Sequence, residues 1–523
     1  KRRMYQMLDK RIARLISDGG PSMAGGLRGL EKEALRVTPD GHVAQTPHPR
    51  ALGAALTHPW ITTDYSEALL EFVTPPFPGT RECLEFLENI HRHVYSNLPD
   101  GEMLWATSMP CIVEGDRSIP IARFGTSNSG LMKHIYRQGL GHRYGRAMQA
   151  ISGIHFNYSL PEAFWDAYVE QEERAGEVRA VRDESYFALL RNYWRYGWIL
   201  LYLFGASPAV CKSFLRGRDR GLPEFDASTR FGPEATSLRM SDLGYRNTNQ
   251  ASVRLSPNSL DDYLAGLEAA MSTPFPAYER IGTLVDGEWR QLSTNVLQIE
   301  NEYYGYVRPK QIARSGERPS HALRREGVRY VEVRALDVNP FEPCGLGATD
   351  VRFLETFLIF CLLHASERLS DSEAAALENN HSRVAVAGRR PGLQLHIDGR
   401  TATLAEWGRE LLAAMVPVAE LLDGGSGGAF GRSVADQLSK VEDPECTPSA
   451  RVLDAMSRQH ASFFEFAMAA SEQRRDEFLA KGPLPDEVLE AFDAAAEASL
   501  EDQSRLEATS DLSFRDFLAE YYA

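Results

Sequence analysis

The chain has 523 residues, of which 43% are hydrophobic and 25% are charged, and both values are normal for a folded globular protein. Its net charge is -15 and it has no basic stripe, which argues against a nucleic-acid or anionic-membrane partner because such partners require clustered Lys and Arg. The longest apolar run, residues 198–211, is too short to span a bilayer and contains Pro208, so we expect it to be a buried core element.

The start of the chain is basic and helical, and it lacks the apolar segment of a signal peptide, so we expect no secretory signal. The six cysteines are far apart and include no C-x-x-C pair, a spacing that suits reduced thiols in the cytosol. They are Cys83, Cys111, Cys211, Cys344, Cys361 and Cys446. We therefore expect a cytoplasmic protein with six free thiols.

Five segments alternate apolar and polar residues with period two, which predicts strands of one sheet. They are residues 27–37, 68–73, 151–160, 296–302 and 328–336. Between them, residues 80–98 and 259–271 have the three- and four-residue spacing of amphipathic helices, which should cover the sheet. After about Leu354 the strand signal fades and Ala, Glu and Leu dominate. We therefore expect a catalytic body over residues 1–365 and a mainly helical region, packed on it, over residues 366–523.

Paired carboxylates stand on the first predicted strand. Glu31 and Glu33 are two residues apart, so both leave one face of the strand while Lys32 leaves the other. Two adjacent carboxylates repel each other unless a cation lies between them, and magnesium prefers oxygen ligands. The pair could form half of a metal site, or it could be an ordinary solvated strand face.

Three more predicted strands carry polar side chains opposite an apolar face. Glu71 belongs to the second and Asp64 comes shortly before it; Glu71 lies among apolar residues and must be paired or bind metal if it is buried. His155 could be a ligand or a hydrogen-bonded core histidine. Glu332 and Arg334 share one strand face. They could form a salt bridge with each other, or they could bind metal and phosphate. The recurrence of this pattern favours a shared site.

No known phosphate-binding loop is present. The patterns G-x-x-x-x-G-K-[ST] and G-x-G-x-x-G do not match the sequence, and H-E-x-x-H is also absent. A protein of this kind that uses ATP must therefore hold the phosphates with metal ions and arginine side chains.

Several long strings resemble the proteobacterial type of glutamate–cysteine ligase in their order and spacing. They include RGLEKEALRV, ALTHPWITTDYSEALLEFVTP, FGTSNSG, ISGIHFNYSLP, LFGASPAVC, SLRMSDLGY, NVLQIENEYY and VEVRALDVNPF. The resemblance is strong to about residue 365 and loose beyond it. It implies an α+β fold similar to that of glutamine synthetase, in which a curved, mainly antiparallel sheet forms a cup around the active site.

The resemblance also implies roles for particular residues. The metal-binding set falls on Glu31, Glu33, Asp64, Glu71, His155 and Glu332. The phosphate-contacting arginines fall on Arg239 and Arg334. The pocket that accepts cysteine falls on Tyr136, Arg137, Gln149, Tyr245 and Tyr304, although each aromatic residue, taken alone, could simply pack in the core.

The activity that this resemblance implies is the magnesium-dependent ligation of L-glutamate to L-cysteine through γ-glutamyl phosphate, with ATP as co-substrate and manganese as a possible substitute metal. It further implies glutathione as a feedback inhibitor and a monomeric enzyme. Two alternatives remain open at this point: a related ligase of the same fold that uses another amine, and a catalytically inactive binding protein.

Overall fold

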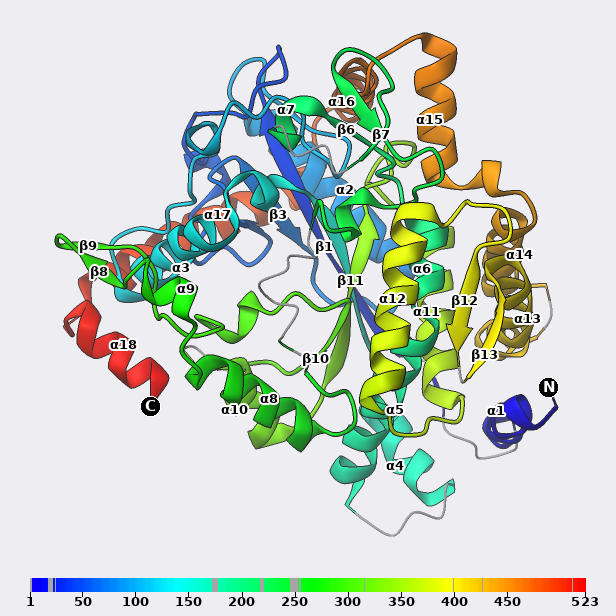
Figure 1. Ribbon diagram of the computed structural model, residues 1–523. Coiled ribbons are helices and arrows are strands. Elements are labelled where there is room, and N and C mark those ends of the chain that lie inside the picture. Colours follow the sequence, from blue (N-terminus) through cyan, green and yellow to red (C-terminus); the bar gives the residue numbers. More distant parts are fainter. Residues whose placement is uncertain are drawn as a thin grey trace.

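The centre of the molecule is a seven-stranded antiparallel sheet (Figure 1). The computed structural model describes residues 2–16, 22–23, 25–171, 177–216, 221–244, 253, 255–314, 316–397, 399–425, 427–509 and 511–523. The strand order is β10-β11-β5-β1-β3-β2, and β4 pairs with the end of β1. The strands are β1 (Leu27–Val37), β2 (Ile61–Thr63), β3 (Leu69–Val73), β4 (Met103–Leu104), β5 (Gly153–Ser159), β10 (Val307–Lys310) and β11 (Tyr330–Asp337).

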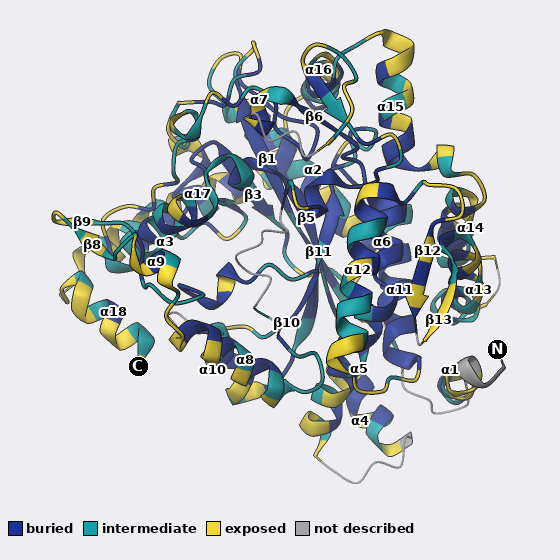
Figure 2. Ribbon diagram, viewed as in Figure 1, coloured by how far each residue is buried: buried dark blue, intermediate teal, exposed yellow. Residues whose placement is uncertain are grey.

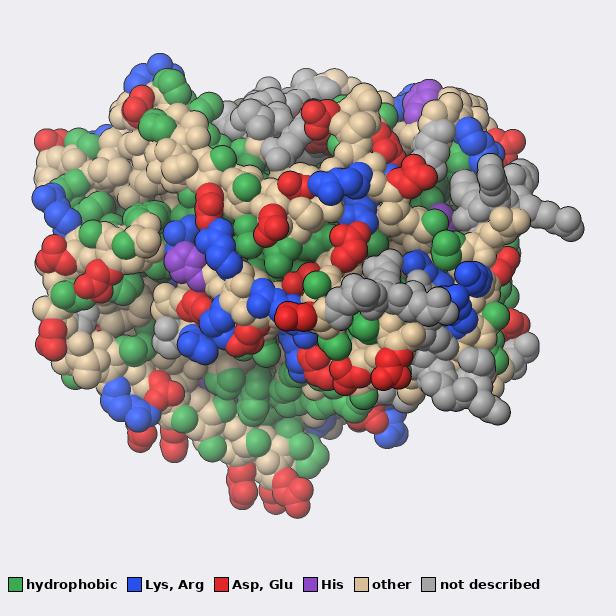
Figure 3. Space-filling view, turned by 90° about the horizontal axis from the view of Figure 1, so that it is seen from below, with side chains coloured by type: hydrophobic (Ala, Val, Ile, Leu, Met, Phe, Trp, Pro, Cys, Tyr) green, Lys and Arg blue, Asp and Glu red, His purple; other side chains and the backbone are tan. Residues whose placement is uncertain are grey.

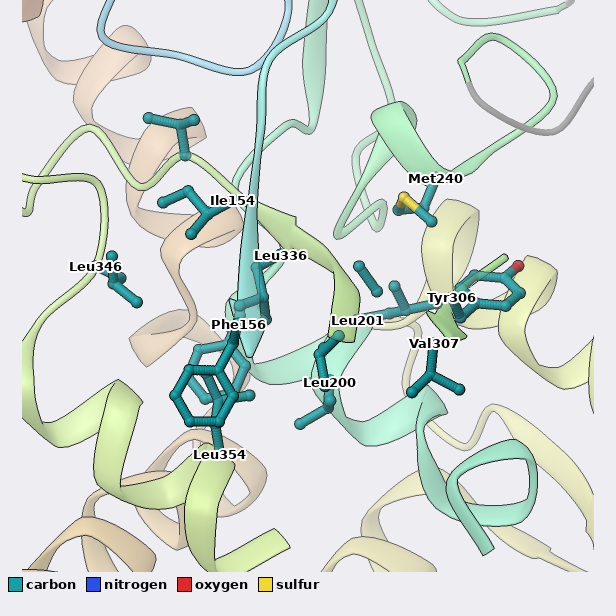
Figure 4. Close-up of a cluster of buried hydrophobic side chains, with 14 of the residues drawn as sticks. Ile154, Phe156, Leu200, Leu201, Met240, Tyr306, Val307, Leu336, Leu346 and Leu354 are labelled. Carbon is teal, nitrogen blue, oxygen red and sulfur yellow. The ribbon is translucent and has the colours of Figure 1, made fainter. Parts of the chain in front are cut away.

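Helices cover the apolar face of this sheet because alternate residues of each strand point toward it. Ile154 and Phe156 of β5 pack with Leu336 of β11 and with Leu354 of a covering helix (Figure 4). The helices on this side include α2 (Thr80–Asn97), α5 (Val178–Tyr196), α6 (Trp198–Phe204), α11 (Ala348–Leu363) and α12 (Asp371–Ala387). Figure 2 shows that the strands, α6 and α11 are mainly buried. The other sheet face is therefore left for the polar side chains.

The remaining elements surround this core. An outer layer of α13 and α14 packs on α11, and α17 and α18 reach the opposite side of the molecule (Figure 1). The other helices are α1 (Arg2–Ile16), α3 (Asn128–Tyr144), α4 (Glu162–Gln171), α7 (Lys212–Leu215), α8 (Leu260–Ser272), α9 (Pro276–Glu279), α10 (Pro319–Glu326), α13 (Leu404–Asp423), α14 (Ala429–Glu442), α15 (Pro448–Gln459), α16 (Phe463–Ala480), α17 (Asp486–Ala508) and α18 (Phe514–Tyr522). Three two-stranded sheets pair β6 (Ala209–Cys211) with β7 (Thr229–Phe231), β8 (Leu284–Val285) with β9 (Glu288–Trp289), and β12 (Gln394–Ile397) with β13 (Arg400–Thr403).

Four of the five predicted strands are confirmed as β1, β3, β5 and β11, and the predicted α+β class is confirmed with them. The prediction for residues 296–302 is wrong, because this segment is a loop that ends in a 3-10 turn, Glu300–Glu302. Glu302 accepts hydrogen bonds from the backbone N–H of Gln298 (2.6 Å) and from Arg143 (2.8 Å). These local bonds compete with a sheet ladder for the backbone groups.

The expectation for residues 198–211 is confirmed, since α6 is buried along its whole length. The expectation of six free thiols is wrong, because Cys111 and Cys211 form a disulfide. The chain brings their Cα atoms to 5.2 Å, within the range that a disulfide requires, although 100 residues separate them in the sequence. Among the described helices, none combines the length and the apolar composition that crossing a bilayer requires.

Candidate active site

A pocket of about 780 Å³ opens over the polar face of the sheet. Its floor is formed by side chains of β1, β3, β5, β10 and β11, and one wall is formed by α3. Acidic and basic side chains are interspersed over the surface seen in Figure 3. Of the thirteen site residues expected from the sequence, eleven line this one pocket, and seven of these eleven are Asp, Glu or Arg.

The strand register explains why distant acidic residues meet. Directly opposed residues of antiparallel strands project from the same face. Glu31 of β1 opposes His155 of β5, and Glu33 of β1 opposes Glu71 of β3. Glu332 of β11 opposes Asn157 on the other side of β5. Strands from three parts of the chain therefore deliver their polar side chains to one surface.

Glu31, His155 and Glu332 form a cluster whose ligand atoms all lie within 4.8 Å of one another. Nδ1 of His155 is 2.9 Å from Oε2 of Glu31 and 3.7 Å from Oε1 of Glu332. Asn157 donates to the second oxygen of Glu31 at 2.9 Å, whereas Oε2 of Glu332 is buried without a hydrogen-bond partner. Two carboxylates and an imidazole this close together, with one buried carboxylate oxygen unsatisfied, fit a hard divalent cation.

The remaining acidic residues of the pocket repel each other. Burial and the charge of Asp64 raise the pKa of Glu33 to about 8. Burial, together with the charges of Asp64 and Glu31, raises the pKa of Glu71 well above its usual value. Burial and the charge of Arg334 lower the pKa of His155, which favours the neutral imidazole that can act as a ligand. Bound cations would relieve this crowding of carboxylates.

Basic side chains border the acidic cluster on the β10–β11 side. Although burial opposes its ionisation, Lys310 and Arg334 hold the pKa of Glu332 well below its usual value. Lys310 Nζ is 3.4 Å, and Arg334 Nη1 is 3.1 Å, from Oε1 of Glu332. Arg334 is two residues after Glu332 on β11, so both side chains leave the same strand face and line the pocket. The pocket thus holds both charges that metal-assisted phosphate chemistry requires.

Arg239 is buried and lies outside the set of side chains that line the pocket. It donates to the backbone carbonyl of Arg334 at 3.1 Å, and its Nη1 is 3.6 Å from Oδ1 of Asp337. A Cβ atom at position 153 would lie 1.9 Å from Nη2 of Arg239, so any other residue there would displace the guanidinium. Because residue 153 shares its strand face with His155, Arg239 lies at the end of the polar floor.

The expected acceptor residues gather at another part of the pocket. Tyr136 and Arg137 project from α3, and the side-chain amide of Gln149 donates to the Tyr304 hydroxyl at 3.0 Å. Burial and the charge of Glu302 raise the pKa of Tyr136 well above its usual value, so the phenol stays protonated. Tyr245 lies outside the described residues.

Sequence reasoning missed several lining residues. Arg308 and Lys310 stand two apart on the short strand β10, and the same-face spacing in VRPK was the available signal. Lys133 lies one turn before Arg137 on α3. A further wall comes from the C-terminal region, and it consists of Leu506, Thr509, Asp511, Leu512, Phe517 and Tyr521. No local pattern in the sequence indicates this last contribution.

The sequence is similar to those of known proteins over almost its whole length. A profile of the family described as glutamate-cysteine ligase matches residues 14–384. The chain is 48% identical over 522 residues to the glutamate–cysteine ligase of Alcanivorax borkumensis, covering 98% of this chain and 99% of that protein. It is 49% identical over 525 residues to that of Azotobacter vinelandii, covering 99% of both.

The fold is also similar to those of solved structures. The crystal structure of glutamate–cysteine ligase from Francisella tularensis in complex with AMP matches with a TM-score of 0.89 and 36% identity, covering 95% of this chain and 97% of that chain. A bifunctional glutathione synthetase from Pasteurella multocida matches with a TM-score of 0.70 and 23% identity, covering 94% of this chain and 57% of that chain. The second match shows a shared fold.

Proposed function

The chain belongs to the glutamate–cysteine ligase family and catalyses the ATP-dependent first step of glutathione synthesis, and we propose which of its residues carry out that reaction. The reaction joins the γ-carboxylate of L-glutamate to the amine of L-cysteine. One observation carries the proposal: acidic and basic side chains from neighbouring strands converge on one sheet face inside a single pocket. The AMP bound by the Francisella relative supports ATP as co-substrate.

We propose that the acidic floor holds magnesium, or manganese in its place. The proposed ligands are the six side chains expected from the sequence, Glu31, Glu33, Asp64, Glu71, His155 and Glu332. The cluster of Glu31, His155 and Glu332, with the unpartnered oxygen of Glu332, supports this assignment. When bound, such a metal would neutralise phosphate charge and polarise the phosphoryl group.

The basic side chains would act on ATP. A carboxylate reacts poorly with an amine because its leaving group would be oxide, so the γ-carboxylate of glutamate must first take a phosphoryl group from ATP. This transfer depends on positioning and on neutralisation of charge. We propose that Arg334 contacts the phosphoryl oxygens together with Arg308 and Lys310, and that Arg239 adds positive charge at the end of the floor. No nucleophilic side chain is needed.

The amine of cysteine would then attack γ-glutamyl phosphate and release phosphate. We propose that Tyr136, Arg137, Gln149, Tyr245 and Tyr304 shape the site for cysteine. The hydrogen bond between Gln149 and Tyr304 supports a pre-organised wall for the four of these residues that the structure describes.

Further features belong to the same proposal. Glutathione contains the γ-glutamylcysteine product, so we propose that it inhibits the enzyme by occupying this pocket. We also propose that the enzyme is active as a monomer. We also propose a cytoplasmic location, where ATP is abundant, although a disulfide such as Cys111–Cys211 is uncommon there.

A further proposal concerns how the C-terminal region is organised relative to the catalytic body. We propose that residues 366–523 pack on the catalytic body of residues 1–365 as one unit with it. The hydroxyl of Tyr522 donates to the carbonyl of Gln298 at 2.7 Å, and Thr57 donates to the carbonyl of Ser499 at 2.6 Å, which supports this arrangement.

The acyl-phosphate step can be tested with hydroxylamine. Incubation of the enzyme with ATP, magnesium and glutamate, without cysteine, should give γ-glutamyl hydroxamate, and omission of either ATP or metal should abolish it. Arg334→Ala and Arg239→Ala should suppress hydroxamate and peptide formation together. Transfer of oxygen-18 from the γ-carboxylate to phosphate during normal turnover is required by this route, and its absence would exclude it.

The same assay separates the alternative functions. Glutamate-dependent ATP turnover that cysteine does not stimulate would indicate another amine substrate. A complete lack of turnover by folded protein, across metals and amino-acid pairs, would indicate a binding protein.

A further inference from the structure

Two cationic side chains on α3 have no role in the assignments made so far for metal or phosphate. Lys133 and Arg137 are four residues apart, so they project from the same side of the helix. Nζ of Lys133 lies 5.2 Å, and the guanidinium carbon of Arg137 lies 4.5 Å, from the centre of the buried Phe124 ring. Both side chains line the pocket.

Among the described residues, neither cation has an ion pair within 4.0 Å, although Asp64 and Glu71 act on Arg137, and Glu71 acts on Lys133, from a greater distance. Arg137 donates to three backbone carbonyl oxygens, those of Asp64, Lys133 and Thr63. These acceptors fix the guanidinium in place but do not neutralise its charge. For Lys133, too, no described carboxylate lies within ion-pairing distance. Burial and the positive charge of Arg137 lower the pKa of Lys133 to about 8, as expected for two like charges in a partly desolvated site.

The position of these cations separates them from the phosphate-binding group. Arg308 and Lys310 stand on β10, at one edge of the sheet. Arg137 contacts Thr63 of β2 and the following Asp64, at the opposite edge. The acidic strands β5, β1 and β3 lie between the two groups. Phosphates bound beside β10 would therefore leave the cations of α3 available for a different anion.

We propose that Lys133 and Arg137 together bind the α-carboxylate of one of the two amino-acid substrates, and that Lys133 is a substrate-binding residue of this enzyme. The inference rests on the proposed function, because it requires glutamate and cysteine to occupy this pocket. A planar carboxylate suits the pair, since Arg137 presents a fixed fork and Lys133 presents a flexible point charge. Its binding would offset the repulsion between them.

The first test is Lys133→Met, which keeps the length of the side chain and removes its charge. We expect the KM of one amino-acid substrate to rise by about tenfold to a hundredfold, the range for loss of a hydrogen bond to a charged group, with little change in the KM of ATP. Lys133→Arg should recover most of the loss. Equal changes in the KM of all three substrates would overturn the proposal.

Decarboxylated substrates identify which amino acid is bound. Cysteamine is cysteine without its α-carboxylate, and 4-aminobutyrate is glutamate without its α-carboxylate. The wild type should prefer each parent substrate. If Lys133 binds the α-carboxylate of cysteine, Lys133→Met should lose the preference for cysteine over cysteamine. If Lys133 binds the α-carboxylate of glutamate, the variant should instead lose the preference for glutamate over 4-aminobutyrate. Survival of both preferences would overturn the proposal.

Two controls keep the result interpretable. Lys133→Gln provides a second neutral variant, and circular dichroism checks the fold of both. Loss of activity with every substrate in both folded variants would also overturn the proposal. Failure of the wild type to form γ-glutamylcysteine would instead refute the proposed function, so the two failures are distinguishable.

Discussion

Glu33→Gln should separate the stability of this enzyme from its activity. Glu33 is 5% exposed, and its Oε2 accepts a hydrogen bond from the backbone N–H of Gly153. Glutamine has nearly the same shape, and its carbonyl oxygen can keep that bond. It cannot ionise, so the substitution removes a buried negative charge that the neighbouring Asp64 opposes.

The sign of the effect follows from the two pKa values. The pKa of Glu33 is about 8 in the folded protein, against 4.5 for an ordinary glutamate. Between these two pH values the folded state holds a proton that the unfolded state has lost, so stability falls as the pH rises. At about 1.4 kcal/mol per pH unit, the metal-free wild type should lose about 3 kcal/mol between pH 5 and pH 7 through this residue.

The assay is urea unfolding of chelator-treated protein between pH 5 and pH 8. The unfolding midpoint of Glu33→Gln should rise relative to that of the wild type as the pH increases. Magnesium should raise the unfolding midpoint of the wild type most strongly near pH 8, because metal binding displaces the proton from Glu33. The variant should gain less from magnesium, and its kcat should be lower. Glu490→Gln, a substitution at an exposed position, is the matched control.

Parallel pH profiles for metal-free wild type and Glu33→Gln would refute this reasoning. They would show that the carboxyl of Glu33 titrates normally in the folded protein. The acidic floor would then not be strained in the absence of metal, and the electrostatic argument for a cation at this position would lose its support.

Three further outcomes are expected. Glu332→Ala or Glu31→Ala should lower kcat by at least about a hundredfold while circular dichroism shows an intact fold, whereas turnover near the parent rate would contradict the ligand assignment. Tyr136→Ala should raise the KM for cysteine more than that for ATP, and equal changes in steady-state kinetics would mark Tyr136 as a packing residue. Cys111→Ser should lower the free energy of unfolding by about 2–5 kcal/mol, because the Cys111–Cys211 disulfide closes a long loop. The folded variant should retain activity, and complete inactivation would show that the Cys111 side chain takes part in the chemistry.

The sheet was predictable from the sequence where one strand face is polar and the other is buried. That contrast is present in β1, β5 and β11. The apolar residues of these strands pack on helices, whereas Glu31, His155 and Glu332 face the pocket. The strands β2 and β10 are too short to show a period, and Pro309 in β10 weakens the signal further. For residues 296–302 the alternation had another cause, since Glu300 and Glu302 turn inward to bond Arg318 and Arg143.

The site was predictable as a set of residues but not as a geometry. Glu31 and His155 are 124 residues apart, and only the β1–β5 register brings them to 2.9 Å. The resemblance supplied the residues, whereas the approach of Arg239 to Gly153 depends on tertiary structure. The Cys111–Cys211 pair illustrates the same limit, because spacing in the sequence does not report distance in the fold.

The C-terminal wall changes how the two predicted regions relate to each other. Leu518 of α18 packs with Ile135 of α3 and with Ile299, and these contacts hold Phe517 and Tyr521 at the pocket. The helix α3 also carries Lys133, Tyr136 and Arg137, so its position depends on packing from the C-terminal region. Amphipathic spacing predicts that such helices exist, but not which surface they cover, since many apolar faces could accept them. Residues far beyond the strongest sequence resemblance therefore support the side chains that we propose to select the amino-acid substrates.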